Sequence, residues 1–394
     1  MKKKSSKKTV LITGGAGFIG SHTADALSKN GYSIVILDNL QPPVHPVRDR
    51  APQGGRSRAF GRAVSNGIHN NKWPSYVLQK GFKLIRGDVR KRADWLKALQ
   101  GVSYVYHLAA YQDQRPDFSK FFDTNTTSTA LLYELILEKK LPVKKVILAS
   151  SQFVYGDGKY QCRHNTRPSL KLRRAGKFFY PELRTEQQFK SKKFDILCSH
   201  GAPAKFFPFR EDQPLTPTNS YGLSKEALER LALRLGKTYA IPTTVLRYSI
   251  VQGPRQSPRN LYSGALRIFT VQALSGKPIT VYEDGNQTRD FVNISDVVSA
   301  NILTLKNSKT DFEIFNVGGG KAYNVLDFAR LVKNITGSSS LILVGGFRRT
   351  DTRHAVSDIS KLKKLGWRPR FGPAKSVRDY VEWYSSEWLH RGQS

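Results

Sequence analysis

The sequence predicts an α/β fold with a doubly wound parallel sheet, followed by a smaller C-terminal substrate domain. Three observations lead to this prediction. Short apolar runs alternate with helical patterns through the first half of the chain, which is typical of a parallel sheet with helices on both faces. A glycine-rich turn directly follows the first apolar run, and an aspartate ends the second run. This combination is typical of the first βαβ unit of a doubly wound sheet.

The expected elements follow this alternation in order. Val10-Leu11-Ile12 is the first strand, residues 19–30 are the helix after it, and residues 34–38 are the second strand. Further strands are expected at 83–87, 104–108, 145–150 and 243–247, with helices near 92–100, 117–140 and 220–240. Beyond residue 250 we expect strands at 280–283, 313–317 and 340–344 and helices at 295–306, 325–336 and 374–391. The predicted domains are therefore residues 9–250 and 251–394.

Basic residues give the chain a formal net charge of +34 and concentrate in residues 1–10, 41–80 and 157–213. Such a field attracts anions, from nucleotides to nucleic acids. A cell whose proteins are basic throughout is the simpler explanation, so no specific nucleic-acid partner is expected. Two cysteines do not make a secreted disulfide scaffold, and no apolar run approaches the length of a membrane span. We expect a cytoplasmic protein with no membrane partner.

Two stretches interrupt the alternation of strands and helices. Residues 41–80 have a middle rich in Gly, Arg and Asn, and we interpret them as a long, exposed, basic loop. Residues 157–215 are also basic and lack a clear periodicity, so we interpret them as an insertion in the first domain.

The glycine-rich turn predicts a dinucleotide site. In the pattern Gly15-x-Gly17-x-x-Gly20, glycines allow a tight turn, close approach to a pyrophosphate and close packing of helix on strand. The pyrophosphate would lie on the helix N-terminus, where N–H groups and the macrodipole favour negative charge. The Asp38 carboxylate can accept the ribose hydroxyls and would repel a 2′-phosphate, which favours NAD over NADP. A ligand-free turn is the alternative, but the register of strand, helix and acid favours NAD.

Three polar residues could carry chemistry near this turn. Tyr221 and Lys225 are four residues apart, so they lie on one face of a helix. A nearby ammonium stabilises a phenolate, and we therefore expect Lys225 to lower the pKa of Tyr221 toward the working pH. Tyr221 could then remove a hydroxyl proton as the adjoining carbon gives up hydride. Ser151 follows a strand at the sheet edge where such sites lie, and could bond the reacting oxygen.

Further motifs occur in order along the chain. They are Gly87-Asp88-Val89, His107-Leu108-Ala109-Ala110, Asn125, Leu246-Arg247-Tyr248, Gly253-Pro254-Arg255-Gln256, Gly285-Asn286-Gln287-Thr288-Arg289-Asp290-Phe291 and Asp296-Val297. With the residues above, they resemble the extended short-chain dehydrogenase/reductase superfamily, in its nucleotide-sugar epimerase and dehydratase branch. The resemblance runs from about residue 9 to 390, and the two interrupting stretches are its chief gaps.

The resemblance implies a Rossmann domain and a role for each matching residue. Tyr221 would be the catalytic base, Lys225 would bind the ribose and tune Tyr221, and Ser151 would hold the sugar oxygen. Arginines would clamp the substrate's diphosphate, because guanidinium binds phosphate oxygens bidentately. The implied cofactor residues are Gly14, Gly17, Phe18, Ile19, Gly20, Asp38, Asn39, Asp88, Val89, Leu108, Ala109, Ala110, Asn125, Tyr221 and Lys225, and the implied substrate residues are Ser151, Arg255, Arg289, Arg348 and Asp351.

The chain departs from this family where dehydratases carry Asp-Glu after the catalytic Ser or Thr. Gln152 and Phe153 occupy these positions, so the acid and base for removing water are absent. Ile250 replaces an Asn that commonly contacts the nucleotide sugar, and Arg348-Arg349-Thr350-Asp351 replaces an Arg-x-Gly-Asp pattern. The first change predicts a different grip on the diphosphate, and the second makes the match of Arg348 and Asp351 to the family pattern less close.

We therefore predict an NAD-dependent 4-epimerase that forms a transient 4-keto sugar and returns the hydride to its opposite face. The expected substrate is a hexose or 6-deoxyhexose on UDP or dTDP. A 4,6-dehydratase or reductase of the same superfamily is the first alternative. A non-catalytic NAD- or nucleic-acid-binding protein is the second, and the Ser151/Tyr221/Lys225 set argues against it.

Two Cys-x-His pairs in the insertion could form a structural zinc site. The four residues are Cys162, His164, Cys198 and His200. Only one residue separates the ligands of each pair, whereas zinc knuckles usually have two, and two unrelated free cysteines are the alternative. The cysteines resemble those in an insertion of a subgroup similar to dTDP-L-rhamnose 4-epimerases.

The resemblance also implies a homodimer that pairs through the helices near 117–140 and 220–240. Apolar residues recur on both segments, although some of them must face the sheet. They are Leu131, Leu132, Leu135 and Ile136 on the first segment and Leu228, Leu231 and Leu235 on the second.

Overall fold

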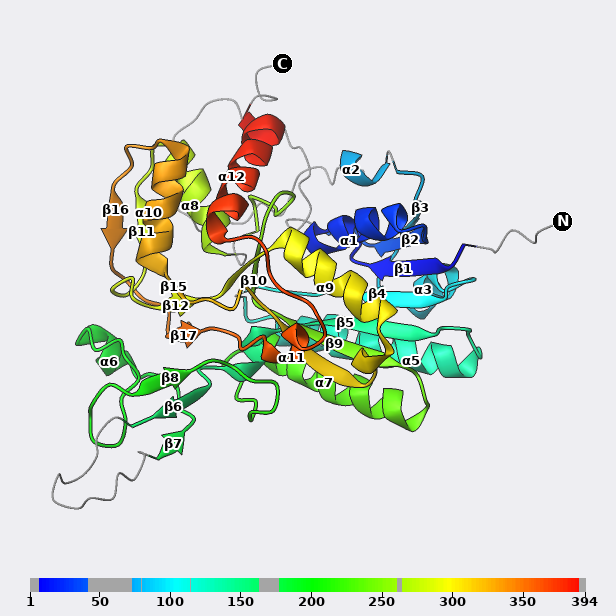
Figure 1. Cartoon of the computed structure of the whole chain (residues 1–394), viewed down its shortest axis with the longest axis horizontal. Coiled ribbons are helices and arrows are strands. Elements are labelled where there is room, and N and C mark those ends of the chain that lie inside the picture. Colours follow the sequence, from blue (N-terminus) through cyan, green and yellow to red (C-terminus); the bar gives the residue numbers. More distant parts are fainter. Residues whose placement is uncertain are drawn as a thin grey trace.

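A computed structural model describes residues 7–41, 73–78, 80–113, 115–162, 177–260 and 264–389. Its centre is a seven-stranded parallel sheet ordered β14-β9-β5-β4-β1-β2-β3 (Figure 1). The strands are β1 (Thr9–Thr13), β2 (Ser33–Asp38), β3 (Lys83–Arg86), β4 (Tyr104–His107), β5 (Lys145–Ser151), β9 (Thr243–Tyr248) and β14 (Glu313–Val317). Strand order reverses beside β1, where β2 and β4 lie on opposite sides. Ligands of doubly wound sheets bind at the carboxyl ends of the strands at such a point.

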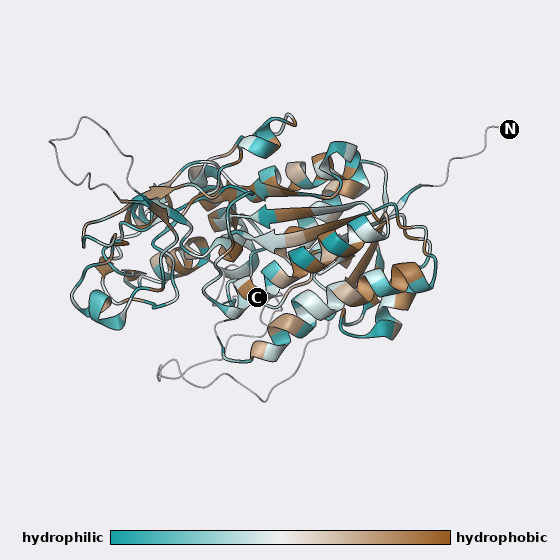
Figure 2. Cartoon of the chain, turned by 90° about the horizontal axis from the view of Figure 1, so that it is seen from below, coloured by the Kyte–Doolittle hydropathy of each residue, from teal (hydrophilic) through white to brown (hydrophobic). Residues whose placement is uncertain are grey.

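Helices cover both faces of the sheet, because successive residues of a strand point to opposite faces. Val10 and Ile12 of β1 pack on one face, with α1 (Phe18–Lys29) and α9 (Ile294–Lys306). Leu11, between them, packs on the other face, with α3 (Arg92–Ala98), α5 (Ser128–Glu138) and α7 (Ser220–Thr238). In Figure 2 the strands are largely hydrophobic and the bordering helices carry hydrophobic and hydrophilic residues on different faces. The predicted doubly wound fold class is thereby confirmed.

Two predicted elements differ from the structure. The strand at 313–317, which we grouped with the second domain, is β14 and extends the main sheet beside β9. The single helix expected near 117–140 is divided into α4 (Phe118–Phe121), the π-helix η1 (Phe122–Thr127) and α5. Apolar spacing locates a buried segment, but it does not encode which sheet edge a strand joins or where a helix changes its hydrogen bonding. The boundary at residue 250 remains a prediction.

Most of the C-terminal part forms a second layer beside the sheet (Figure 1). Its core is built from three helices, α8 (Ala265–Leu274), α10 (Val325–Thr336) and α12 (Pro373–Tyr384). Short strand pairs and a three-stranded sheet connect these helices, and α11 (Ser360–Lys363) precedes α12 in the chain. These strands are β10 (Ile250–Gln252), β11 (Ile279–Val281), β12 (Thr288–Arg289), β13 (Phe291–Asn293), β15 (Tyr323–Asn324), β16 (Ile342–Val344) and β17 (His354–Ala355).

The insertion forms its own small antiparallel sheet at one end of the molecule (Figure 1). Its elements are β6 (Lys159–Gln161), β7 (Phe178–Phe179), α6 (Glu186–Lys190) and β8 (Lys205–Phe207). Strands of two or three residues are too short to give a periodic signal, which explains why the sequence showed none. The predicted basic loop at 41–80 falls largely outside the described residues, which include α2 (Ser75–Leu78) near its end.

Short helical turns complete the described elements. They are the 3-10 helices η2 (Gln152–Tyr155) and η3 (Ser308–Thr310) and the π-helix η4 (Ser385–Leu389). Within the described ranges, every helix is too short or too polar to cross a membrane.

Candidate active site

A cavity of about 430 Å³ opens at the carboxyl ends of the central strands. Phe18 at the start of α1, Leu108 after β4 and Ser151 at the end of β5 line one part of it. Arg289 and Arg348, from the C-terminal part, line another. The cavity is therefore shared between the dinucleotide-type sheet and the C-terminal layer.

The glycine turn is packed too closely to admit side chains. Gly14 has a φ of +67°, and a Cβ there would lie 2.8 Å from the Ala109 nitrogen. A Cβ on Gly20 would lie 2.2 Å from the Gly14 carbonyl oxygen. Gly17 precedes α1, and no described side chain caps the helix there. The turn therefore leaves an uncapped helix N-terminus, which suits a pyrophosphate.

Asp38 lies against this turn at the end of β2. Its buried carboxylate accepts hydrogen bonds from the Ala16 nitrogen at 3.0 Å and the Leu40 nitrogen at 2.9 Å. A carboxylate at the end of the second strand of a doubly wound sheet is placed to accept the ribose hydroxyls of a dinucleotide. The next residue, Asn39, donates to Asp88 over 3.4 Å, and Arg90 pairs with the same aspartate at 2.7 Å.

The remaining predicted cofactor residues divide into two groups. Phe18, Ile19, Leu108 and Ala110 line the cavity. Others hold the turns around it: the Ala109 nitrogen donates to Thr13 Oγ1 at 3.2 Å, and Val89 is buried with its carbonyl bonded to Trp95. The side chain of Asn125 accepts from the Tyr111 nitrogen and donates to Ser224 Oγ, each at 2.9 Å. Asn125 thus fastens the loop after β4 to α7.

Ser151 and Tyr221 meet in the cavity and share a hydrogen bond. Asn219 caps α7 by accepting a bond from the Gly222 nitrogen at 2.9 Å, which fixes the first turn that carries Tyr221. Gln112 donates to the Tyr221 hydroxyl at 2.5 Å. The sequence analysis missed Gln112, and its position two residues after Ala110 was the one available signal.

Lys225 lies one helical turn after Tyr221, but it does not have the predicted effect on the tyrosine. Burial raises the pKa of Tyr221 to about 12, against the lowering effect of hydrogen bonds with Gln112 and Ser151. Burial also lowers the pKa of Lys225 to about 7. The ammonium donates to the Ala149 carbonyl at 2.8 Å and lies 5.9 Å from the Tyr221 ring centroid. The expected lowering was therefore wrong, because burial disfavours the charged forms of both groups.

Three charged residues of the predicted substrate site lie together at the C-terminal side of the cavity. Arg289 is held by its bond to the Thr288 carbonyl at 2.9 Å, and the Arg348 guanidinium lies 4.7 Å from the Tyr282 ring centroid. Asp351 also lines the cavity, and burial raises the pKa of its carboxyl group against the charges of both arginines. Two cations beside one acid suit a diphosphate.

Arg255 is not brought to this group, in contrast to the prediction. Its guanidinium pairs with Asp25 of α1 at 2.8 Å and lies 4.6 Å from the Tyr76 ring centroid. It is not among the described residues that line the cavity. The sequence motif identified Arg255 but could not show where its side chain points. The ion pair with Asp25, on a helix far away in the sequence, sets that direction.

Gln152 and Phe153 line the cavity immediately after Ser151. Neither side chain can exchange a proton at ordinary pH. Among the described lining residues the single acid is Asp351, which faces Arg289 and Arg348. The part of the cavity around Ser151 therefore lacks the paired acid and base that elimination of water requires.

Three of the four predicted zinc ligands meet in the insertion. Cys162 Sγ lies 2.7 Å from Cys198 Sγ and 3.5 Å from His200 Nδ1, and Cys198 Sγ lies 4.0 Å from the same nitrogen. The hydrogen bond with Cys162 lowers the pKa of the Cys198 thiol to about 7, although burial opposes it. His164 lies outside the described residues.

The fold and this site define a dinucleotide-binding α/β protein of the short-chain dehydrogenase/reductase type. The chain belongs to the NAD dependent epimerase/dehydratase family, whose model matches residues 10–176 and 196–318. It is 30% identical over 387 residues to the dTDP-L-rhamnose 4-epimerase of Burkholderia thailandensis, covering 96% of each chain. It is 28% identical over 379 residues to a putative UDP-glucose 4-epimerase of Methanocaldococcus jannaschii, covering 95% of this chain and 97% of the relative.

Solved structures give the same assignment. The UDP-glucose 4-epimerase of Thermotoga maritima with UDP-glucose matches with a TM-score of 0.71 and 26% identity, covering 96% of this chain and 99% of that one. The UDP-glucuronic acid 4-epimerase of Bacillus cereus with UDP-glucuronic acid and NAD matches with a TM-score of 0.71 and 25% identity, covering 96% and 100%.

Proposed function

We propose that the chain is an NAD-dependent epimerase that inverts C4 of the sugar in a nucleotide-activated hexose or 6-deoxyhexose. One observation carries the proposal. The cavity joins Ser151 and Tyr221 to an arginine pair, and the described residues around Ser151 include no acid–base pair that could eliminate water. The names of the relatives from B. thailandensis and T. maritima support C4 epimerisation of a nucleotide sugar.

The residues at the sheet edge fit NAD. Side chains at Gly14 or Gly20 would fill the space beside the turn, and no described side chain caps the N-terminus of α1. The Asp38 carboxylate, at the end of β2, would accept the ribose hydroxyls. When bound, NAD supplies an acceptor and later a donor of hydride. Leu108 and Ala110 would line its path toward Ser151.

Tyr221 would take the proton of the C4 hydroxyl as that carbon is oxidised, and would return it in the second half of the reaction. Gln112 and Ser151 favour the phenolate, since their hydrogen bonds lower its pKa against the effect of burial. Ser151 would also bond the reacting sugar oxygen. Lys225 Nζ lies 5.9 Å from the Tyr221 ring centroid. When Lys225 is protonated, its positive charge would favour the phenolate of Tyr221.

The arginine pair would retain the substrate between the two halves of the reaction. Arg289 and Arg348 would bind the diphosphate, which does not react, while the keto sugar turns to present its other face. Gln152 and Phe153 offer no acid or base for elimination, so return of the hydride is the remaining outcome.

Incubation with NAD and a panel of UDP-, dTDP-, GDP- and CDP-sugars tests this function. We expect interconversion of C4 epimers with unchanged mass, and dTDP-L-rhamnose and UDP-glucose are the first two compounds to try. A product lighter by one water would replace the epimerase with the dehydratase alternative. A net change in NADH would instead favour a reductase.

We also propose a homodimer through the surface that α5 and α7 share. Phe118, Phe122, Leu137 and Leu223 are exposed along these helices and the adjoining α4 and η1. Burial of such side chains favours association by about 25 cal/mol per Å² of apolar surface. Light scattering at micromolar concentration should give twice the chain mass, and a monomer would contradict the proposal.

We further propose that Cys162, Cys198 and His200 bind a structural zinc ion. Cysteine and histidine are residue types that zinc prefers, and the ligand atoms of these three residues all lie within 4.8 Å of one another. Zinc–sulfur bonds of about 2.3 Å place two sulfurs about 3.8 Å apart in a tetrahedral site, so the 2.7 Å pair must separate. Metal analysis after purification without chelators should find one zinc per chain, and a metal-free protein would contradict the site.

A further inference from the structure

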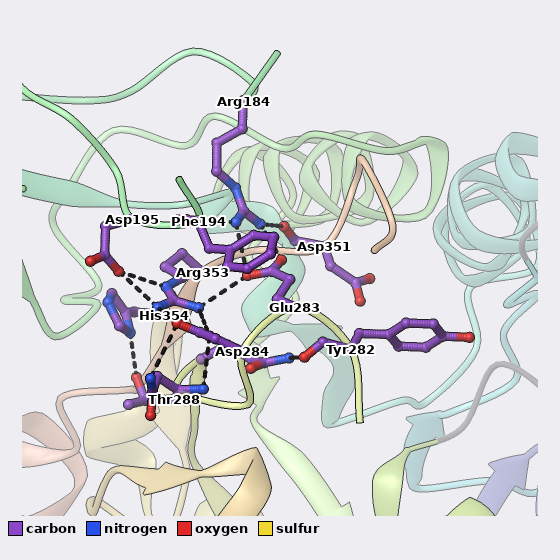
Figure 3. Close-up of polar contacts among 12 residues, drawn as sticks. Arg184, Phe194, Asp195, Tyr282, Glu283, Asp284, Thr288, Asp351, Arg353 and His354 are labelled. Carbon is purple, nitrogen blue, oxygen red and sulfur yellow. Dashed lines mark hydrogen bonds and ion pairs between the residues drawn. The ribbon is translucent and has the colours of Figure 1, made fainter. Parts of the chain in front are cut away.

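Part of the insertion lies against the arginine side of the cavity. Residues 177–195 fall in the gap between the two stretches that match the family model, so they are a feature of this chain beyond the family pattern. They include β7, Arg184 and α6. Figure 3 shows Arg184 beside Glu283 and Asp351, which belong to the C-terminal part.

The guanidinium of Arg184 is almost completely buried, and its nitrogens bond three different segments. It pairs with both oxygens of Glu283 at 2.8 and 3.0 Å. It also donates to the Phe194 carbonyl at 2.8 Å and to the Asp351 carbonyl at 2.6 Å. A bidentate pair of this kind fixes direction as well as distance. Arg184 therefore ties the backbone at Asp351 to Glu283.

Both ends of this link adjoin residues of the cavity. Glu283 follows Tyr282, whose ring lies under the Arg348 guanidinium. Arg353 also pairs with Glu283, at 3.1 Å (Figure 3). The Arg353 carbonyl accepts a bond from Arg289 at 3.3 Å. Glu283 is thus linked to Arg348 through Tyr282 and to Arg289 through Arg353.

Residues of α6 make two further contacts, both with the loop of residues 347–351. Phe189 stacks on Phe347, with ring centroids 4.6 Å apart and planes 8° from parallel. Glu186 lies 3.9 Å from Arg349 in an exposed ion pair, which contributes little by itself. The insertion therefore contacts residues 347, 349 and 351, on either side of Arg348.

We infer that Arg184 and Phe189 are positioning residues, which hold the loop of residues 347–351 so that Arg348 faces the diphosphate of the substrate. The inference rests on the proposed function for the identity of the diphosphate. It predicts that the insertion sets affinity at the nucleotide end of the cavity, while the chemistry at Tyr221 proceeds unchanged. An arginine pair binds phosphate well only when its guanidinium groups are held in the right orientation. A loosened loop should therefore lower substrate affinity more than it lowers kcat.

The test measures binding of UDP and dTDP to the full chain by calorimetry, with kcat and KM measured separately. Arg184→Lys keeps the charge but loses the fork, and Phe189→Leu keeps apolar volume but loses the stack. We expect about tenfold weaker binding for Arg184→Lys and about threefold for Phe189→Leu, with KM rising in step and kcat within about twofold.

Arg210→Lys is the matched control, because Arg210 forms an exposed ion pair with Asp212 in the same insertion. It should bind as the wild type does, and thermal unfolding should show all three variants folded at the assay temperature. Wild-type binding by folded Arg184→Lys and Phe189→Leu would overturn the inference, as would a fall in kcat without a change in binding. Binding of UDP and dTDP is measured without turnover. A failed epimerase assay would therefore contradict the proposed function but would leave the binding result, and this inference, to be judged separately.

Discussion

At the residue scale, the proposed chemistry depends on the single hydroxyl of Tyr221. Tyr221→Phe keeps the buried ring, which packs edge-on against Phe153, and removes the atom that Gln112 and Ser151 bond. We expect kcat to fall at least about a hundredfold, the usual scale for the loss of general acid–base help. NAD binding, followed by fluorescence, should persist. Turnover within a few-fold of the wild type would remove Tyr221 from its role.

The buried Lys225 should make stability depend on pH. Its pKa falls from 10.5 to about 7 on folding, so between these values the unfolded chain binds more protons than the folded one. The contribution of Lys225 to the free energy of unfolding is therefore fully present above pH 10.5 and is lost as the pH falls to about 7. Between these values the free energy of unfolding changes by up to about 1.4 kcal/mol per pH unit.

Lys225→Met removes that titration and leaves all the others. Urea unfolding of the NAD-free protein should show the wild type gaining stability relative to Lys225→Met between pH 7 and 10. The difference between the two proteins is the informative quantity, because other groups titrate in both. Parallel stability curves over this range would show that Lys225 keeps an ordinary pKa.

At the element scale, the turn between β1 and α1 should tolerate no added methyl group. Gly20→Ala would place a Cβ 2.2 Å from the Gly14 carbonyl oxygen, which forces the turn open. We expect NAD affinity to fall at least about tenfold, since the pyrophosphate site is formed by this backbone. Gly101→Ala is the control: a Cβ there meets open space, and only its positive φ costs stability. Equal NAD affinity in both variants would contradict the assignment.

Helices and strands with a repeated apolar pattern could be predicted from the sequence. Very short strands, and local changes in helical hydrogen bonding, could not. The strands around Leu11 and Ile147 are buried on both faces and read as apolar runs. The π-helical turns of η1 and the two-residue strand β7 have no such pattern. Motifs located Ser151 and Tyr221 in the cavity. Tertiary contacts between distant segments bring Gln112 to Tyr221 and Arg184 to Glu283, behind the cavity.

At the scale of the whole molecule, the site exists only where the two parts of the chain meet. Ser151 and Tyr221 come from the sheet, and Arg289 and Arg348 come from the C-terminal part, with the insertion behind them. Sequence reasoning listed these residues without their spatial order, and it also listed Arg255, which pairs with Asp25 instead. Direction of a long side chain depends on its partner, which sequence spacing does not reveal.

The most direct test of C4 epimerisation is the mass of the epimerised product formed in D₂O, after exchangeable positions are returned to hydrogen. Hydride that leaves C4 and returns to C4 never mixes with solvent, so substrate and epimer should have the same mass. Inversion by removal and return of a proton would add deuterium at carbon, and elimination would remove a water. We expect recovery of the C4 epimer without added mass. Carbon-bound deuterium at C4 or a dehydrated product would contradict epimerisation by return of the hydride.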